Sequence, residues 1–302
     1  MINDDSSHAI THEIFERSSK PDTVGRNWPK MIADVNTKAK EMKIDQMLAG
    51  PIVLMLLATT SAPALAEDQL ISGMVGGGLS YGSTFLGSDE SEVGFIPLID
   101  LEIGRYGFLN QRGIGLQNST TLQNGELSYG LGIGYDFEKR ISKDDARLNG
   151  LPDVKAGALA TLFMEYEIGR LTYGFEVQRG LSDDGPKGTR AKLYGTYRSQ
   201  FGNSNRVQVS ATPYLTLADD AWMDAFFGVT GDRALASGLA AFDPGSGLAQ
   251  AGVTLTGSYA LTERTILFTS FDLSTLAGDA KDSSVSFEDT QVSISTGVLF
   301  RL

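Results

Sequence analysis

Residues 126–138 read ELSYGLGIGYDFE, and this stretch decides the fold. Apolar side chains occupy every second position, namely Leu127, Tyr129, Leu131, Ile133, Tyr135 and Phe137. Glycine, serine and acidic residues fill the positions between them. A period of two predicts a β-strand with one apolar and one polar face. The stretch is also long, because strands of soluble proteins usually have about 5–6 residues, whereas a tilted bilayer crossing needs about 9–11.

The same alternation recurs from about residue 70 to residue 302. It is clear in the segments that begin near Lys155, Leu171, Val253 and Val292. A soluble β-sandwich would bury charges of the polar face in its core, which is costly. A membrane barrel instead turns the apolar face to lipid and the polar face to its lumen. We therefore predict an all-β protein, a transmembrane antiparallel up-and-down β-barrel.

The number of strands follows from the segments and from the turns between them. Eleven segments begin near Leu70, Gly94, Phe108, Glu126, Lys155, Leu171, Arg190, Arg206, Ala249, Thr265 and Gln291. Single-chain bacterial barrels have even numbers of strands. The alternation of short turns and long loops fails before Gly125, so one strand is split or merged between Tyr81 and Thr121. The prediction is about 12 strands, with 10 as the alternative.

The first 66 residues are unlike the rest. Leu48–Thr60 is continuously apolar but shorter than the ~20 residues of a spanning helix. Met42-Lys43 precedes it and Ala64-Leu65-Ala66 follows it, which is the pattern of a secretory signal. We predict a signal peptide over 42–66, cleavage between Ala66 and Glu67, and a barrel over 67–302 in the outer membrane of a Gram-negative cell. Residues 1–41 are expected to be a non-native or disordered upstream extension.

Composition argues against catalysis and against nucleic acid as a partner. The chain has no cysteine, and its two histidines, His8 and His12, precede the predicted signal. A barrel that begins at Glu67 thus lacks the usual proton shuttle of hydrolases and the imidazole of zinc or haem sites. A net charge of −12 disfavours phosphate backbones. We predict no enzyme activity, no catalytic residues, no cofactor and no metal site.

Two groups of residues are candidates for a functional role. Charges on the polar faces of the strands are expected to line the lumen: Glu126, Asp136, Glu165, Glu176, Arg190 and Arg198. The pair Glu165 and Glu167 could do acid–base chemistry, but lumen charges paired across the barrel are the simpler interpretation. The long segment Ala218–Leu248 carries aromatic residues that either fold into the barrel mouth, which we favour, or meet a partner: Trp222, Phe226, Phe227 and Phe242.

Several blocks of sequence resemble the MipA/OmpV family of outer-membrane proteins. In order they are Phe85–Asp89, Pro97–Asp100, Leu131–Asp136, Arg147–Leu151, Ala218–Met223, Phe226–Val229, Ala236–Leu239 and Phe242–Leu248. Leu302 departs from the family because barrels usually end in an aromatic residue, and residues 1–41 also depart from it. The blocks otherwise cover nearly all of 70–302.

The resemblance implies an outer-membrane barrel. The partners expected of a barrel in that membrane are its lipid and its lipopolysaccharide. It also implies a scaffold that joins a murein transglycosylase to a peptidoglycan synthase, and it supplies no catalytic residues. A small-solute channel is the alternative function, because about twelve strands can enclose a narrow lumen.

Overall fold

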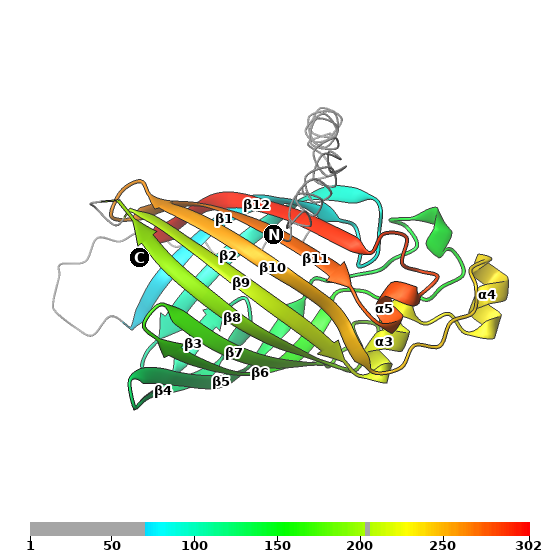
Figure 1. Ribbon diagram of the computed structural model, residues 1–302, viewed down its shortest axis with the longest axis horizontal. Helices are drawn as coiled ribbons and strands as arrows, with labels where there is room; N and C mark the ends of the chain where they lie inside the picture. Colours follow the sequence, from blue (N-terminus) through cyan, green and yellow to red (C-terminus); the bar gives the residue numbers. More distant parts are fainter. Residues whose placement is uncertain (1–69, 203–205) are drawn as a thin grey trace, which may run out of the picture. The chain divides into compact units, whose positions relative to one another are not determined.

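The computed structural model describes residues 70–202 and 206–302, so the predicted signal peptide, its cleavage site and residues 1–41 lie outside it. Within these ranges twelve antiparallel strands form one closed barrel in chain order, and β1 pairs with β12 (Figure 1). The strands are β1 (Ile71–Ser83), β2 (Ser91–Ile103), β3 (Gly107–Asn110), β4 (Gly113–Leu122), β5 (Gly125–Asp136), β6 (Gly157–Ile168), β7 (Leu171–Gly180), β8 (Thr189–Phe201), β9 (Val207–Ala218), β10 (Gly247–Ala260), β11 (Thr265–Leu276) and β12 (Thr290–Arg301).

The predicted barrel and its twelve strands are confirmed, and the alternative of ten is excluded. The segment that begins near Phe108 is a hairpin of two strands, β3 and β4, which turns at Gln111-Arg112. This merger explains the count of eleven. One strand differs from the prediction that every strand crosses the membrane: β3 has only four residues, far fewer than a crossing needs.

The alternation that predicts the strands also sets their orientation. Along β5 the outward side chains of Tyr129, Leu131, Ile133 and Tyr135 are 43%, 59%, 59% and 52% exposed. Gly132 and Asp136, between and beyond them, are buried. A long row of exposed apolar side chains suits a wall surrounded by lipid. No helix in the described ranges is long and apolar enough to cross a membrane.

Long and short connections gather at opposite ends of the barrel, named here the loop end and the turn end. The loop end carries residues 84–90, 137–156, 181–188, 219–246 and 277–289. The turn end carries 104–106, 123–124, 169–170 and 261–264, together with the end of β8 at Phe201 and the start of β9 at Val207. Helices α3 (Asp220–Phe227), α4 (Gly231–Ser237) and α5 (Asp279–Asp282) and the 3₁₀ helix η3 (Ala146–Leu148) all belong to the loop end. In Figure 1 the three α-helices cluster at the right.

Glycines allow β1 to lie close to its neighbour β12. A Cβ atom on Gly76 would stand 1.9 Å from the Val298 carbonyl oxygen, and one on Gly78 would stand 2.4 Å from that of Thr296. Both distances are well inside van der Waals contact with backbone atoms. The seam that closes the barrel therefore requires glycine at these two positions.

Candidate functional site

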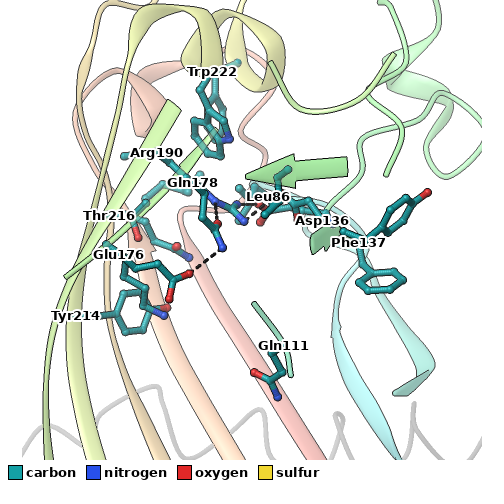
Figure 2. A pocket seen from close by; sticks show the side chains of 18 residues that line it. Leu86, Gln111, Asp136, Phe137, Glu176, Gln178, Arg190, Tyr214, Thr216 and Trp222 are labelled. Carbon is teal, nitrogen blue, oxygen red and sulfur yellow. Dashed lines mark hydrogen bonds and ion pairs between the residues drawn. The ribbon is translucent and has the colours of Figure 1, made fainter. Parts of the chain in front are cut away.

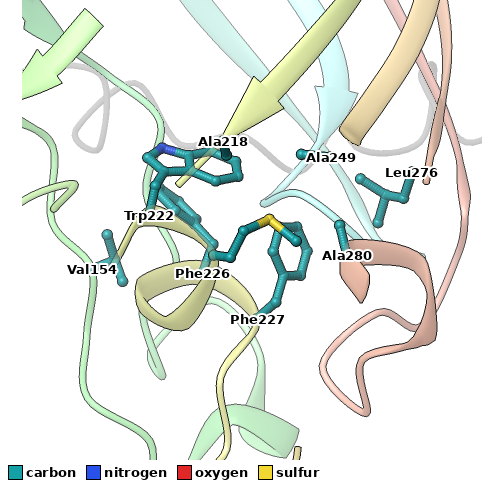
Figure 3. Close-up of a cluster of buried hydrophobic side chains, with 9 residues drawn as sticks. Val154, Ala218, Trp222, Phe226, Phe227, Ala249, Leu276 and Ala280 are labelled. Carbon is teal, nitrogen blue, oxygen red and sulfur yellow. The ribbon is translucent and has the colours of Figure 1, made fainter. Parts of the chain in front are cut away.

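The loop-end mouth of the barrel contains a compact apolar core. Four side chains of α3 are almost completely buried: Trp222, Met223, Phe226 and Phe227 are 3%, 0%, 1% and 0% exposed. They pack on Val154, Ala218, Ala249, Leu276 and Ala280, which come from strand ends and two other connections (Figure 3). We call α3 and these contacts the plug. It starts at Asp219, whose Oδ1 accepts the Trp222 N–H at 2.9 Å and caps the helix.

An ion cluster lies directly against the plug. The Arg190 guanidinium donates to Asp136 at 3.0 Å, to Gln178 at 2.7 Å and also to Glu138. Its Cζ stands 6.0 Å from the centre of the Trp222 ring. Figure 2 shows Trp222 next to Arg190 in the lining of the same pocket. Burial raises the pKa of Glu138, and the neighbouring Arg190 opposes that shift. The cluster joins β5 to β8 beneath the plug.

A second ion cluster crosses the lumen from the β3–β4 turn. Arg112 Nε donates to Glu176 at 2.8 Å, and its Nη2 donates to Glu165 at 2.7 Å and to the Tyr194 hydroxyl at 2.8 Å. The Tyr194 hydroxyl also donates to Glu165. The guanidinium lies over the ring of Phe163 at 4.1 Å. One arginine thus fastens the short hairpin to β6, β7 and β8.

The lumen contains three cavities in series, from the plug toward the turn end. A cavity of about 400 Å³ lies beneath the plug, one of about 610 Å³ follows it, and one of about 510 Å³ follows that. The first and second share Glu176 and Lys192, and the second and third share Glu165. Lys192 lies over the Tyr214 ring at 4.1 Å. The lumen is therefore hollow, lined by charged side chains and subdivided by ion pairs.

The structure brings some of the proposed lumen residues together and leaves others apart. Asp136 and Arg190 meet in the cluster at the plug, whereas Glu165 and Glu176 meet through Arg112. Arg198 bonds Thr172 at 2.8 Å and approaches Glu167 at 3.4 Å. Glu126 lines the last cavity of the series.

Of the four loop aromatics, one lies apart from the plug. Trp222, Phe226 and Phe227 belong to the plug, and Phe242 packs instead on a second apolar cluster that includes Phe85, Leu148, Val229 and Val285. Arg112 is not among the predicted site residues, because the segment that begins near Phe108 counts as one strand in the sequence and the turn that carries Arg112 is not apparent there.

A third ion cluster ties two loops together on the outside of the second apolar cluster. Arg147 donates to Asp145 Oδ2 at 2.6 Å and to both oxygens of Asp89, and its guanidinium covers the Phe287 ring at 3.7 Å. Hydrogen bonds from Arg147 lower the pKa of both Asp89 and Asp145 below the ordinary range of aspartate.

This lowering predicts a loop that loosens in acid. A carboxylate whose pKa is depressed in the folded state adds stability above its ordinary pKa of about 4, and that stability is lost as the pH falls through the folded value. A nitroxide label at Glu90→Cys should therefore be equally immobile at pH 7 and pH 5 and more mobile below about pH 4. Because Asp89 is half-exposed, the change should be worth at most about 1 kcal/mol.

The matched control for this loop is Arg147→Gln. It should make the label mobile at every pH and abolish the acid transition. An unchanged spectrum at pH 3 in the labelled Glu90→Cys chain that keeps Arg147 would contradict the assignment.

One protein-family model matches the chain. A family model described as MltA-interacting protein MipA matches residues 75–302, which is nearly all of the barrel. No curated protein matches the chain.

Solved outer-membrane barrels are similar only at low identity. OprB of Pseudomonas putida is 8% identical, with a TM-score of 0.39, over 63% of this chain and 48% of that one. OmpF of Salmonella typhi is 10% identical, with a TM-score of 0.34, over 63% and 51%. OmpT of Vibrio cholerae is 7% identical, with a TM-score of 0.35, over 79% and 100%. The match thus spans about half the length of the first two proteins.

Proposed function

The chain belongs to the family of the MltA-interacting protein MipA, and on that premise we propose that it is a non-catalytic outer-membrane barrel that serves as a scaffold for peptidoglycan enzymes. The plug is the observation that carries the proposal. It closes the loop-end mouth with a buried apolar core, and ion clusters cross the lumen behind it. A barrel that is closed and cross-linked in this way suits a protein that binds partners on its outer surfaces.

The turn end is the surface on which we place the partner. In membrane barrels the short turns face the periplasm and the long loops face outward. Here the turn end exposes apolar side chains, among them Tyr106 at 45%, Leu122 at 50% and Leu261 at 52%. A murein transglycosylase, the kind of partner that the family's name suggests, would meet this end. The loop end would meet lipopolysaccharide.

Site-specific cross-linking tests this assignment. A photo-reactive residue at Leu261, on the turn end, is expected to capture a murein transglycosylase in cells. The same residue at Leu235, which is 88% exposed on α4 at the loop end, is the matched control and should capture none. Repeated failure of the Leu261 variant to capture any murein enzyme would contradict the scaffold function. Capture by the Leu235 variant would show that the loop end, instead of the turn end, faces the periplasm.

The cavities in series favour a small-solute channel as the second candidate. They run from beneath the plug toward the turn end and are lined by both acidic and basic side chains. Conductance in a planar bilayer separates the two functions. Steady single-channel steps from the native chain would support a channel, and silence would support a plugged barrel.

A further inference from the structure

One edge of strand β2 has almost no partner. On its β1 side, β2 pairs over its whole length from Ser91 to Ile103. On the other side it pairs with β3 only at Leu101, Glu102 and Ile103. Between Val93 and Asp100 no strand in the described part of the chain pairs with this edge. The barrel closes here through three residue pairs alone.

The opposite border of this gap is formed by β5. Strand β4 pairs with β5 only up to Ile133, so Gly134–Asp136 extend past it toward the loop end. The turn at Gln111-Arg112 ends the short hairpin below the gap. Above the gap, Lys139 approaches Glu92 at 3.6 Å and joins the segment after β5 to the top of β2. The gap is thus a bounded window in the wall.

The position of Pro97 in β2 fits an unpaired edge, because proline has no N–H group to donate to a neighbouring strand. Gly104 N–H donates to the Leu70 carbonyl at 2.7 Å, which marks residues 70 and 104 as a hydrogen-bonded pair. Hydrogen-bonded and non-hydrogen-bonded pairs alternate along an antiparallel ladder. In that register Pro97 and Gly77 form a non-hydrogen-bonded pair, so the nitrogen of Pro97 faces the window. Proline in sheets is confined to such unpaired positions because it has no N–H to donate.

The window opens among exposed apolar side chains on the outer face of the barrel. Phe95 and Ile99 flank Pro97 on the outer face of β2 and are 69% and 39% exposed. Backbone groups cannot remain unpaired in hydrocarbon, and irregular backbone at this depth is tolerated where it lines a water-filled cavity. The open edge of β2 should therefore be in contact with the wet lumen.

Cavities reach the window from inside. The cavity of about 610 Å³ is lined by outward-facing Ile99 together with Arg112 and Glu165 of the lumen. The cavity of about 400 Å³ is lined by Phe137, which is 72% exposed, together with Glu176 and Arg190. Exposed apolar side chains and lumen charges thus line the same cavities. The inner face of β2 at the window is itself apolar, with Ile96 and Leu98.

We propose that the window is a lateral portal, through which a small amphiphile with one apolar chain and a cationic head passes between the membrane and the lumen. The apolar rim formed by Phe95, Ile99 and Phe137 suits the chain. Asp100, which lines the cavity beside Ile99 at the window itself, suits the head because it has no ion pair among the described residues. The cations of the same cavity lie on other elements: Arg112 is held by Glu165 and Glu176, Arg198 lies near Glu167, and Lys192 lies over the Tyr214 ring. This inference is independent of the scaffold, which uses the turn end.

Single-cysteine variants can test the portal, because the native chain has no cysteine. Leu98→Cys places a thiol on the inner face of β2 at the window. Thr256→Cys is the matched control, since it lies on the inner face of β10, which is paired on both sides. Both proteins are refolded in lipid vesicles and treated with dodecyl maleimide in the bilayer or with a small water-soluble maleimide.

The bilayer reagent should modify Leu98→Cys at least about tenfold faster than Thr256→Cys, whereas the water-soluble reagent should modify both at similar rates because both thiols face water. Equal, slow modification by dodecyl maleimide would overturn the portal. Disulfide-linked dimers of Phe95→Cys in the vesicles would also overturn it, since a second copy would then cover the edge.

The charge of the head is tested by competition. Dodecylammonium should slow the modification of Leu98→Cys, dodecyl sulfate should not, and Asp100→Asn should abolish the protection by dodecylammonium. Equal protection by both amphiphiles, or protection that survives in Asp100→Asn, would overturn the cationic specificity.

Discussion

Arg112→Met is expected to destabilise the barrel by about 3 kcal/mol, because removing one partner of a buried ion pair leaves the others uncompensated. The substitution leaves Glu165 and Glu176 side by side and the Tyr194 hydroxyl without its arginine. It also removes the only side chain that fastens the β3–β4 turn across the lumen to β6, β7 and β8 in the described structure. The expected value is at the lower end of the usual range because the three charged side chains are 15–27% exposed and can reach lumen water.

Urea unfolding of the refolded protein in detergent measures this loss. Arg105→Met is the matched control, because Arg105 stacks on Tyr106 at 5.1 Å in an exposed turn and should change the free energy of unfolding by less than about 0.5 kcal/mol. The triple variant that adds Glu165→Gln and Glu176→Gln should recover much of the stability, since it removes the stranded charges. Equal stability of Arg112→Met and the native chain would show that the cluster contributes nothing.

Phe226→Ala is expected to destabilise the plug by about 3–5 kcal/mol, the usual cost of truncating a buried aromatic side chain. Phe226 is 1% exposed, and its ring lies 4.7 Å from that of Trp222. The ladders of the barrel do not depend on this side chain. The plug should therefore unfold before the strands, instead of with them.

Two probes separate the plug from the barrel. In a chain that begins at Glu67, Trp222 is the one tryptophan, so its fluorescence reports the plug, while far-ultraviolet circular dichroism reports the strands. Phe226→Ala should shift only the fluorescence transition, and Leu235→Ala, on the exposed side of α4, should shift neither. A common shift of both transitions would mean that the plug and the barrel form a single cooperative unit.

The strands were predictable from sequence because lipid and water impose opposite chemistry on alternate residues. That is why the row from Leu127 to Phe137 suffices to orient β5, and why the polar positions of β6 to β8 supply the lumen charges. The signal peptide stays a prediction, since it lies outside the described residues.

The β3–β4 hairpin was not predictable in detail. Gln111 and Arg112 interrupt an apolar alternation without the glycine or asparagine pair that usually marks a two-residue turn. The register that leaves β2 unpaired above Leu101 is set by contacts between distant strands. No local pattern reports such contacts, so both the role of Arg112 and the window came only from the structure.

The composition of the plug dictates an order of assembly. Its apolar core draws Val154, Trp222 and Ala280 from three connections that are far apart in the chain. Contacts between distant residues form late, because the intervening chain must first be arranged. A newly inserted barrel should accordingly pass through a stage in which its loop-end mouth is still open, so that small polar compounds reach the cavity of about 400 Å³ from that end.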